Sequence, residues 1–196
     1  RLGPEHLDTI RLHNEIARAR SQSGDPGQAR SDLTALLGDL KSSLGADHPG
    51  TLITAMTLAG IGVEAGSPLL AVQEIESILP RLERTLGPEH EVTLAALEHL
   101  ANAYGESGDD TAIRVYDDLI ERWRGLVGED HRRTVILRAD RAYWLGHLGD
   151  AAASEEALGQ LLPEVTRVLG PLDPNTLRAR NNRAYFLTDH AAAFEE

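Results

Sequence analysis

Apolar residues return with the same spacing in four separate segments of this chain. The first such series is Ala29, Leu33, Leu36, Leu37, Leu40 and Leu44. The same steps of four, three, one, three and four residues recur from Ala71, Ala112 and Ser154. This spacing keeps the apolar side chains on one face of an α-helix. The pattern therefore predicts four amphipathic helices of similar sequence.

A short motif, LGxxHxxT, lies next to each of these segments. It reads LGPEHLDT from Leu2, LGADHPGT from Leu44, LGPEHEVT from Leu86, VGEDHRRT from Val127 and LGPLDPNT from Leu169. The last copy has Asp173 where the others have histidine. The final threonines of successive motifs are 42, 42, 41 and 42 residues apart. A constant period of this length indicates stacked supersecondary units.

Glycines divide each unit into two predicted helices. Gly24, Gly66, Gly108 and Gly149 each lie 15 residues after the motif threonine. Glycine adopts the left-handed conformation that ends a helix, and the Asp or Ser that follows suits the start of the next one. We therefore expect helix pairs at residues 7–45, 49–87, 91–128, 132–170 and 174–196, the last pair being truncated.

Two further features concern packing. An alanine recurs eight residues after each threonine, which predicts close helix contacts at Ala17, Ala59, Ala101, Ala142 and Ala184. Pro80 and Pro163 fall inside second helices, where proline removes a hydrogen bond, so we expect a kink or a break there. The chain opens in a linker, and a fifth second helix would only be starting at residues 191–196. We expect a fragment of a longer protein.

These features resemble a known family. Helix pairs with alanine at the eighth position and Gly-Asp at the fifteenth and sixteenth are similar to tetratricopeptide (TPR) repeats, and the 42-residue period with its LGPEHxxT linker resembles the kinesin-light-chain subtype. The segment NNRAYF from Asn181 resembles the subtype's NNLAxxY stretch. The resemblance implies an all-α fold, a right-handed TPR superhelix (an α-solenoid of antiparallel helix pairs) formed as a single array over residues 1–196.

Composition excludes several classes of function. The formal charge of −12 over 196 residues disfavours nucleic-acid binding, and the absence of cysteine excludes disulfides and cysteine-ligated zinc. No apolar run approaches the roughly 18 residues of a membrane span, so we expect no membrane partner and a cytoplasmic location. Lys41 is the only lysine among 19 basic residues, which is typical of GC-rich bacterial genomes, where this subtype is abundant.

The histidines of the motif raise the question of metal binding. His6, His48, His90 and His131 would lie about 10 Å apart along a stack of helices, too far for shared ligation. We therefore interpret them as caps or packing groups of the helix junctions. His90 and Glu91 begin an HExxH pattern, but Leu94 replaces its second histidine. No nucleotide-binding or hydrolase motif occurs, and we expect neither an enzyme nor a cofactor or metal.

The resemblance implies a protein-binding groove lined by the first helices. Its usual positions correspond here to Arg11, Asn14, Arg18, Gln22, Ile53, Met56, Val63, Glu98, Asn102, Glu106, Ile136, Tyr143, His147, Arg178, Asn181 and Tyr185. Asparagine can hold a peptide main chain and arginine can bind a carboxylate, so we predict a peptide or protein partner with an acidic or C-terminal carboxylate group near Arg11 and Arg18.

Two other interpretations remain open from the sequence. The array could serve as a regulatory or sensor module in cis to a serine/threonine kinase or a signalling NTPase, which is how the subtype often occurs in bacteria. Two copies could also form a homodimer through apolar faces exposed at the ends of the array.

Overall fold

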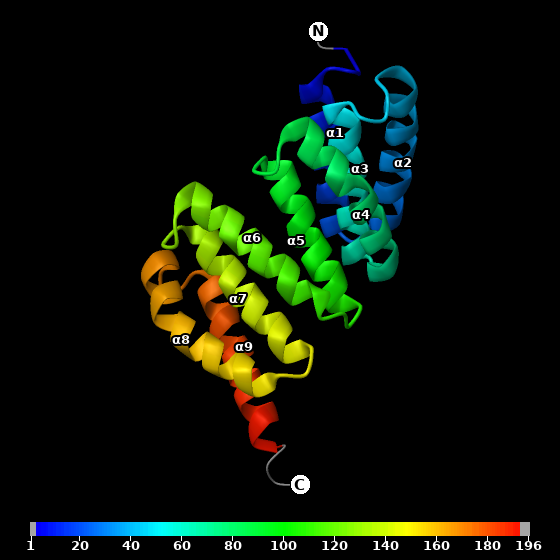
Figure 1. Ribbon diagram of the computed structural model, residues 1–196. Coiled ribbons are helices and arrows are strands. Elements are labelled where there is room, and N and C mark those ends of the chain that lie inside the picture. Colours follow the sequence, from blue (N-terminus) through cyan, green and yellow to red (C-terminus); the bar gives the residue numbers. More distant parts are fainter. Residues whose placement is uncertain (1–2, 193–196) are drawn as a thin grey trace. The chain divides into compact units, whose positions relative to one another are not determined.

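The computed structural model describes residues 3–192, except for the side chains of 64 and 189–192, and every regular element in that range is an α-helix (Figure 1). The helices are α1 (Leu7–Gln22), α2 (Pro26–Ser43), α3 (Pro49–Glu64), α4 (Pro68–Leu86), α5 (Glu91–Glu106), α6 (Thr111–Val127), α7 (Arg132–His147), α8 (Ala151–Leu169) and α9 (Pro174–Ala192). The odd-numbered helices are the first helices of the predicted pairs, and the even-numbered ones are the second. The expected all-α class is confirmed.

The chain divides into two compact units, Arg1–Ala103 and Tyr104–Glu196, and the boundary falls inside α5. In the first unit α1 packs against α2 and α3, α2 packs against α3, and α3 packs against α4. In the second unit α6, α7, α8 and α9 pack in chain order, and α7 also touches α9. Consecutive helices within a unit run in opposite directions, as α7 and α8 show (Figure 1).

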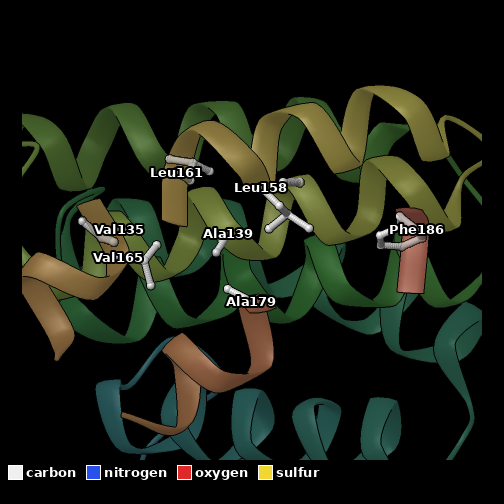
Figure 2. Packing of buried hydrophobic residues seen from close by; sticks show 8 residues of the cluster. Val135, Ala139, Leu158, Leu161, Val165, Ala179 and Phe186 are labelled. Carbon is white, nitrogen blue, oxygen red and sulfur yellow. The ribbon is translucent and has the colours of Figure 1, made fainter. Parts of the chain in front are cut away.

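The predicted apolar faces form the core. In α8 the residues Ser154, Leu158, Leu161 and Val165 are buried. Figure 2 shows Leu158, Leu161 and Val165 of α8 gathered with Val135 and Ala139 of α7 and with Ala179 and Phe186 of α9. Burying a large apolar side chain contributes about 1.5–3 kcal/mol, so these faces hold neighbouring helices together.

The motif threonine and glycine form a repeated hydrogen bond in the linkers. The threonine hydroxyl donates to the carbonyl of the glycine six residues earlier, at 2.8–2.9 Å, in the pairs Thr51–Gly45, Thr93–Gly87, Thr134–Gly128 and Thr176–Gly170. These four threonines are at most 1% exposed. The four glycines have φ between 88° and 99°, a conformation that other residues rarely adopt. The motif therefore fixes the path of the chain from each second helix to the next first helix.

The motif histidine caps the helix that follows it. Nδ1 of His6, His48, His90 and His131 accepts a hydrogen bond from the backbone N–H two residues later, at 3.1–3.2 Å. In the last linker the Asp173 carboxylate accepts from the N–H of Asn175 at 2.9 Å, and this bond chiefly holds the pKa of Asp173 below its ordinary value. The interpretation of the histidines as caps is confirmed. Within residues 3–192 no three His, Cys, Asp or Glu side chains are placed to share a metal ion.

Two packing expectations need correction. The helices α4 and α8 continue through Pro80 and Pro163, so neither helix breaks there. A kink, the other expected outcome, stays a prediction. Both prolines are exposed, and water can satisfy a carbonyl that loses its helical partner there. The recurring alanine is buried in the first four units, but Ala184 is exposed, because within the described residues no helix follows α9 to cover it. Residues 193–196, where a fifth second helix was expected to continue, lie outside the described residues.

In the second unit, a glycine of one first helix lies against an aromatic ring of the next first helix. A Cβ atom added to Gly105 of α5 would lie 2.4 Å from Trp144 of α7, and one added to Gly146 of α7 would lie 2.4 Å from Phe186 of α9. Trp144 and Phe186 are 7% and 1% exposed. The missing side chains therefore make room for the two buried rings.

The linker hydrogen bond can be tested by removing one hydroxyl group. Thr93→Val should lower the free energy of unfolding by about 1–2 kcal/mol, because the valine cannot donate to the Gly87 carbonyl. Thr93→Ser keeps the hydroxyl donor and should lower the free energy of unfolding by less. Thr34→Val removes an exposed hydroxyl on α2 and should change stability by less than about 0.5 kcal/mol. Urea titration followed by circular dichroism measures all three, and equal losses for Thr93→Val and Thr34→Val would contradict the role given to the linker.

The histidine cap can be tested at α3. His48→Ala should lower the free energy of unfolding by about 1 kcal/mol, because the N–H of Gly50 loses its acceptor. His48→Asn supplies another good capping oxygen and should recover most of that loss. Thermal denaturation compares the two variants, and an asparagine variant as unstable as the alanine variant would rule out capping as the role of His48.

The surroundings of Gly105 and Gly125 predict opposite effects on stability when either glycine is replaced by alanine. Gly105→Ala should destabilise the protein by about 1–3 kcal/mol, because its Cβ would collide with the Trp144 ring. Gly125→Ala lies within α6, where an added Cβ meets nothing within 4 Å, and should stabilise it by about 0.5–1 kcal/mol. Chemical denaturation of both variants provides the check. Stabilisation by both would show that the tryptophan does not need the glycine.

Candidate protein-binding site

A hollow of about 430 Å³ lies on the first helices of the first unit. Its walls come from α1, α3 and α5 and are formed by Arg11, Glu15, Arg18, Ile53, Met56, Glu91, Val92, Ala95 and His99. No residue of a second helix lines it. The hollow therefore lies on the first helices, where the resemblance to TPR repeats implies a binding groove.

The repeat period explains why these residues meet. Arg11, Ile53 and Ala95 are each 42 residues apart, so they occupy the same place on α1, α3 and α5. Met56 follows Ile53 by about one helical turn and is 3% exposed, so it contributes to the floor rather than to the rim. Successive repeats thus place a basic, an apolar and a small residue in one row.

Charged groups surround this apolar floor. Arg18 of α1 lies 3.3 Å from the carboxylate of Glu15, and its other terminal nitrogen donates to the hydroxyl of Thr57 on α3 at 3.4 Å. Arg11 is exposed on the same helix, and Glu91 is exposed at the start of α5. The hollow can therefore offer guanidinium donors, carboxylate acceptors and an apolar surface to one bound segment.

The other groove residues expected in the first unit lie outside the lining of the hollow. Asn14 is 3% exposed, and its Nδ2 donates to the carbonyl of Ile10 and to the hydroxyl of Thr54 on α3. It therefore joins α1 to α3. Gln22 is exposed at the end of α1, and Glu98 and Asn102 are half-buried on α5.

Several residues of the hollow were not predicted from the sequence. They are Glu15, Glu91, Val92, Ala95 and His99. A signal existed for Ala95, which has the same repeat position as Arg11 and Ile53. Glu15 and His99 also share a repeat position, since they lie two periods apart, and this position was not among those expected to line the groove.

The second unit carries a row of aromatic rings on its first helices. The ring of His147 lies 4.3 Å from that of Tyr143 on α7 and 6.1 Å from that of Tyr185 on α9, measured between centroids. Tyr185 is 57% exposed, and burial together with the charge of Glu106 raises the pKa of Tyr143. All three of these rings belong to the predicted groove set.

Arg178 and Asn181, which were also expected to line the groove, are exposed on α9. Arg178 donates to the carboxylate of Asp140 on α7 at 2.6 Å, and Asn181 lies one turn beyond it. The structure therefore brings together Tyr143, His147 and Tyr185, with Arg178 tied to α7 by an ion pair. No described helix is sufficiently long and apolar for a membrane span.

The second unit also has a hollow, which is less suited to a ligand than the hollow of the first unit. It measures about 410 Å³ and lies on α6, α7 and α8. Its arginines already have carboxylate partners, since Arg141 binds Asp117 at 2.6 Å and Arg138 binds Glu164 at 2.7 Å. A bound anion would have to displace these ion pairs.

Comparisons with known proteins define the fold. No protein-family model and no curated protein matches the chain. The solved structures that match it include kinesin light chain nearly identical TPR-like repeats from Podosopora anserina and a single-residue variant of that protein. Each has a TM-score of 0.79 and 22% sequence identity, and the match covers 97% of this chain and 91% of the other. The chain therefore has the TPR-like repeat fold, an α-solenoid of antiparallel helix pairs.

Proposed function

We propose that this protein is a non-catalytic interaction module that binds a peptide or protein segment on the surface of its first helices. The observation that carries the proposal is the hollow on α1, α3 and α5, where equivalent positions of three repeats meet. Repeat arrays of stacked helices use such surfaces for binding. The fold of the matching kinesin light chain repeats supports the same role.

The chemistry of the hollow favours a segment with a carboxylate next to an apolar side chain. Arg11 and Arg18 lie on one helix, seven residues apart, and a guanidinium group binds a carboxylate through two parallel hydrogen bonds. Ile53 and Met56 provide an apolar floor for a neighbouring side chain. Glu91 is exposed and can accept hydrogen bonds from the peptide main chain or from a basic residue of the partner, while Glu15 pairs with Arg18.

The aromatic row of the second unit is a further surface on which a partner could bind. Tyr143 and Tyr185 combine an apolar ring with a hydroxyl group, a combination that is enriched at interfaces. Asn181 is exposed on α9 and has both an amide donor and an amide acceptor for a main chain. These residues form the part of the proposed surface that lies in the second unit.

The proposal predicts the outcome of a peptide selection. A display library of random peptides with free C-termini should yield binders enriched in acidic or C-terminal carboxylate groups next to apolar residues. Arg11→Ala combined with Arg18→Ala should weaken those binders at least tenfold, because each charge-assisted hydrogen bond contributes about 1.5–3 kcal/mol. Fluorescence anisotropy with the selected peptides measures the loss.

The matched control removes the same charge elsewhere. Arg84→Ala combined with Arg167→Ala changes two exposed arginines on second helices and should leave affinity within about twofold. Equal weakening by both double variants would show that the loss of affinity comes only from the change in net charge. Full affinity after loss of Arg11 and Arg18 would show that this hollow does not hold the carboxylate.

A further inference from the structure

The aromatic row of the second unit consists of Tyr143 and His147 of α7 and Tyr185 of α9. The rings of His147 and Tyr185 are nearly parallel, with 11° between their planes. The buried ring of Phe186 lies edge-on to Tyr185, with 5.1 Å between the two ring centroids. The row therefore rests on the core, while His147 and Tyr185 themselves are exposed.

The repeat positions of the row are exposed elsewhere in the array as well. Tyr185 has the repeat position of Arg18, and His147 has that of Glu106. Another first helix follows Arg18, Glu106 and His147 in the chain. Even so, Glu106 and His147 are exposed, and 48% of the Arg18 side chain is exposed. These two positions therefore remain accessible where a further repeat follows.

A carboxylate without a basic partner lies near the row. Glu106 is exposed at the end of α5, and it forms no ion pair with any residue that the structure describes. Burial raises the pKa of Tyr143, and the charge of Glu106 raises it further, so this carboxylate lies within electrostatic reach of the Tyr143 ring. Arg178 acts on the same ring in the opposite direction, but its charge is compensated by Asp140, to which it donates at 2.6 Å. The uncompensated charge beside the row is therefore negative.

We propose that the aromatic row and Glu106 together bind an arginine side chain of the partner segment. The faces of an aromatic ring attract a cation, and a flat guanidinium group can stack on a ring while its N–H groups donate to a carboxylate. The row supplies the ring faces and Glu106 supplies the carboxylate. This inference rests on the proposed function, because it names one residue of the segment that binds on the first helices.

The protein contains one contact of this kind within its own fold. The guanidinium carbon of Arg133 on α7 lies over the ring of Trp123 on α6, 5.8 Å from the ring centroid. In the described part of the chain, no arginine or lysine lies over the rings of Tyr143 or Tyr185 in this way. A cation from a partner would therefore have no internal competitor at the row.

Three small amides test the proposal on the full chain. N-acetyl-arginine amide carries the guanidinium group, N-acetyl-citrulline amide is a neutral analogue of nearly the same shape, and N-acetyl-leucine amide is apolar. In NMR titrations, the arginine compound should shift the ring signals of Tyr143 and His147 in a saturable manner. Its affinity should be about threefold to tenfold higher than that of either neutral compound, since it gains a cation–π contact and an exposed charge pair.

Substitutions show which groups bind the arginine compound. Glu106→Gln should weaken its binding about twofold to fivefold, because the charge pair is lost. Tyr143→Leu should weaken it by about the same factor, whereas Tyr143→Phe keeps a ring and should retain most of the affinity. The matched control Glu156→Gln removes the same charge from the exposed surface of α8, keeps the oxygen that accepts from Gln160, and should leave the affinity unchanged. Circular dichroism melting checks that Tyr143→Leu is folded, and the exposed Glu106→Gln tests the site independently.

Three results would overturn the proposal. The first is the absence of saturable shifts in the row with the arginine compound. The second is equal affinity for the arginine, citrulline and leucine compounds, since the row would then be an apolar surface with no preference for a cation. The third is a loss from Glu106→Gln no greater than that from Glu156→Gln, since net charge alone would then explain the binding. The proposed function fails separately, if the display library yields no binders, because the amide titrations do not depend on selected peptides.

Discussion

The hydrogen bond between a linker threonine and the glycine six residues before it fixes how each helix pair follows the last. The glycine has a positive φ that turns the chain out of a second helix, and its carbonyl then accepts the hydroxyl of a buried threonine. The histidine between them caps the next helix. Because these contacts lie within eight residues of sequence, the same hydrogen bond recurs at the four junctions that begin at Gly45, Gly87, Gly128 and Gly170.

Because the junctions have the same contacts, the residues on the helix faces can differ from one repeat to the next. Arg11, Ile53 and Ala95 have the same place in three successive repeats but different chemistry, and together they line one hollow. The fold thus supplies the position of this surface, and single substitutions within the repeat set its chemistry.

Features that depend on local sequence could be predicted from it, whereas features that depend on neighbours could not. The helix pairs, the apolar faces and the histidine caps follow from spacing and from turn chemistry. The continuous helices at Pro80 and Pro163 depend on solvent exposure, and the exposure of Ala184 depends on what packs against α9.

The candidate site likewise contains some residues that could be predicted from the sequence and others that could not. The repeat position of Arg11 and Ile53 was sufficient to place them in the hollow, and Met56 followed from the same pattern. Asn14 turned instead toward Thr54, because a buried amide takes the nearest hydroxyl and carbonyl partners. Glu15 and His99 share a repeat position two periods apart, but that position was outside the set that the resemblance implies.

Hydrogen exchange with a bound peptide tests the central claim most directly. A peptide selected for binding should slow amide exchange in α1, α3 and the first two turns of α5, around the residues that line the hollow, while α2 and α4 exchange as in the free protein. Protection confined to the second helices, or absent from α1 and α3, would show that the first-helix surface is not where this protein holds another polypeptide.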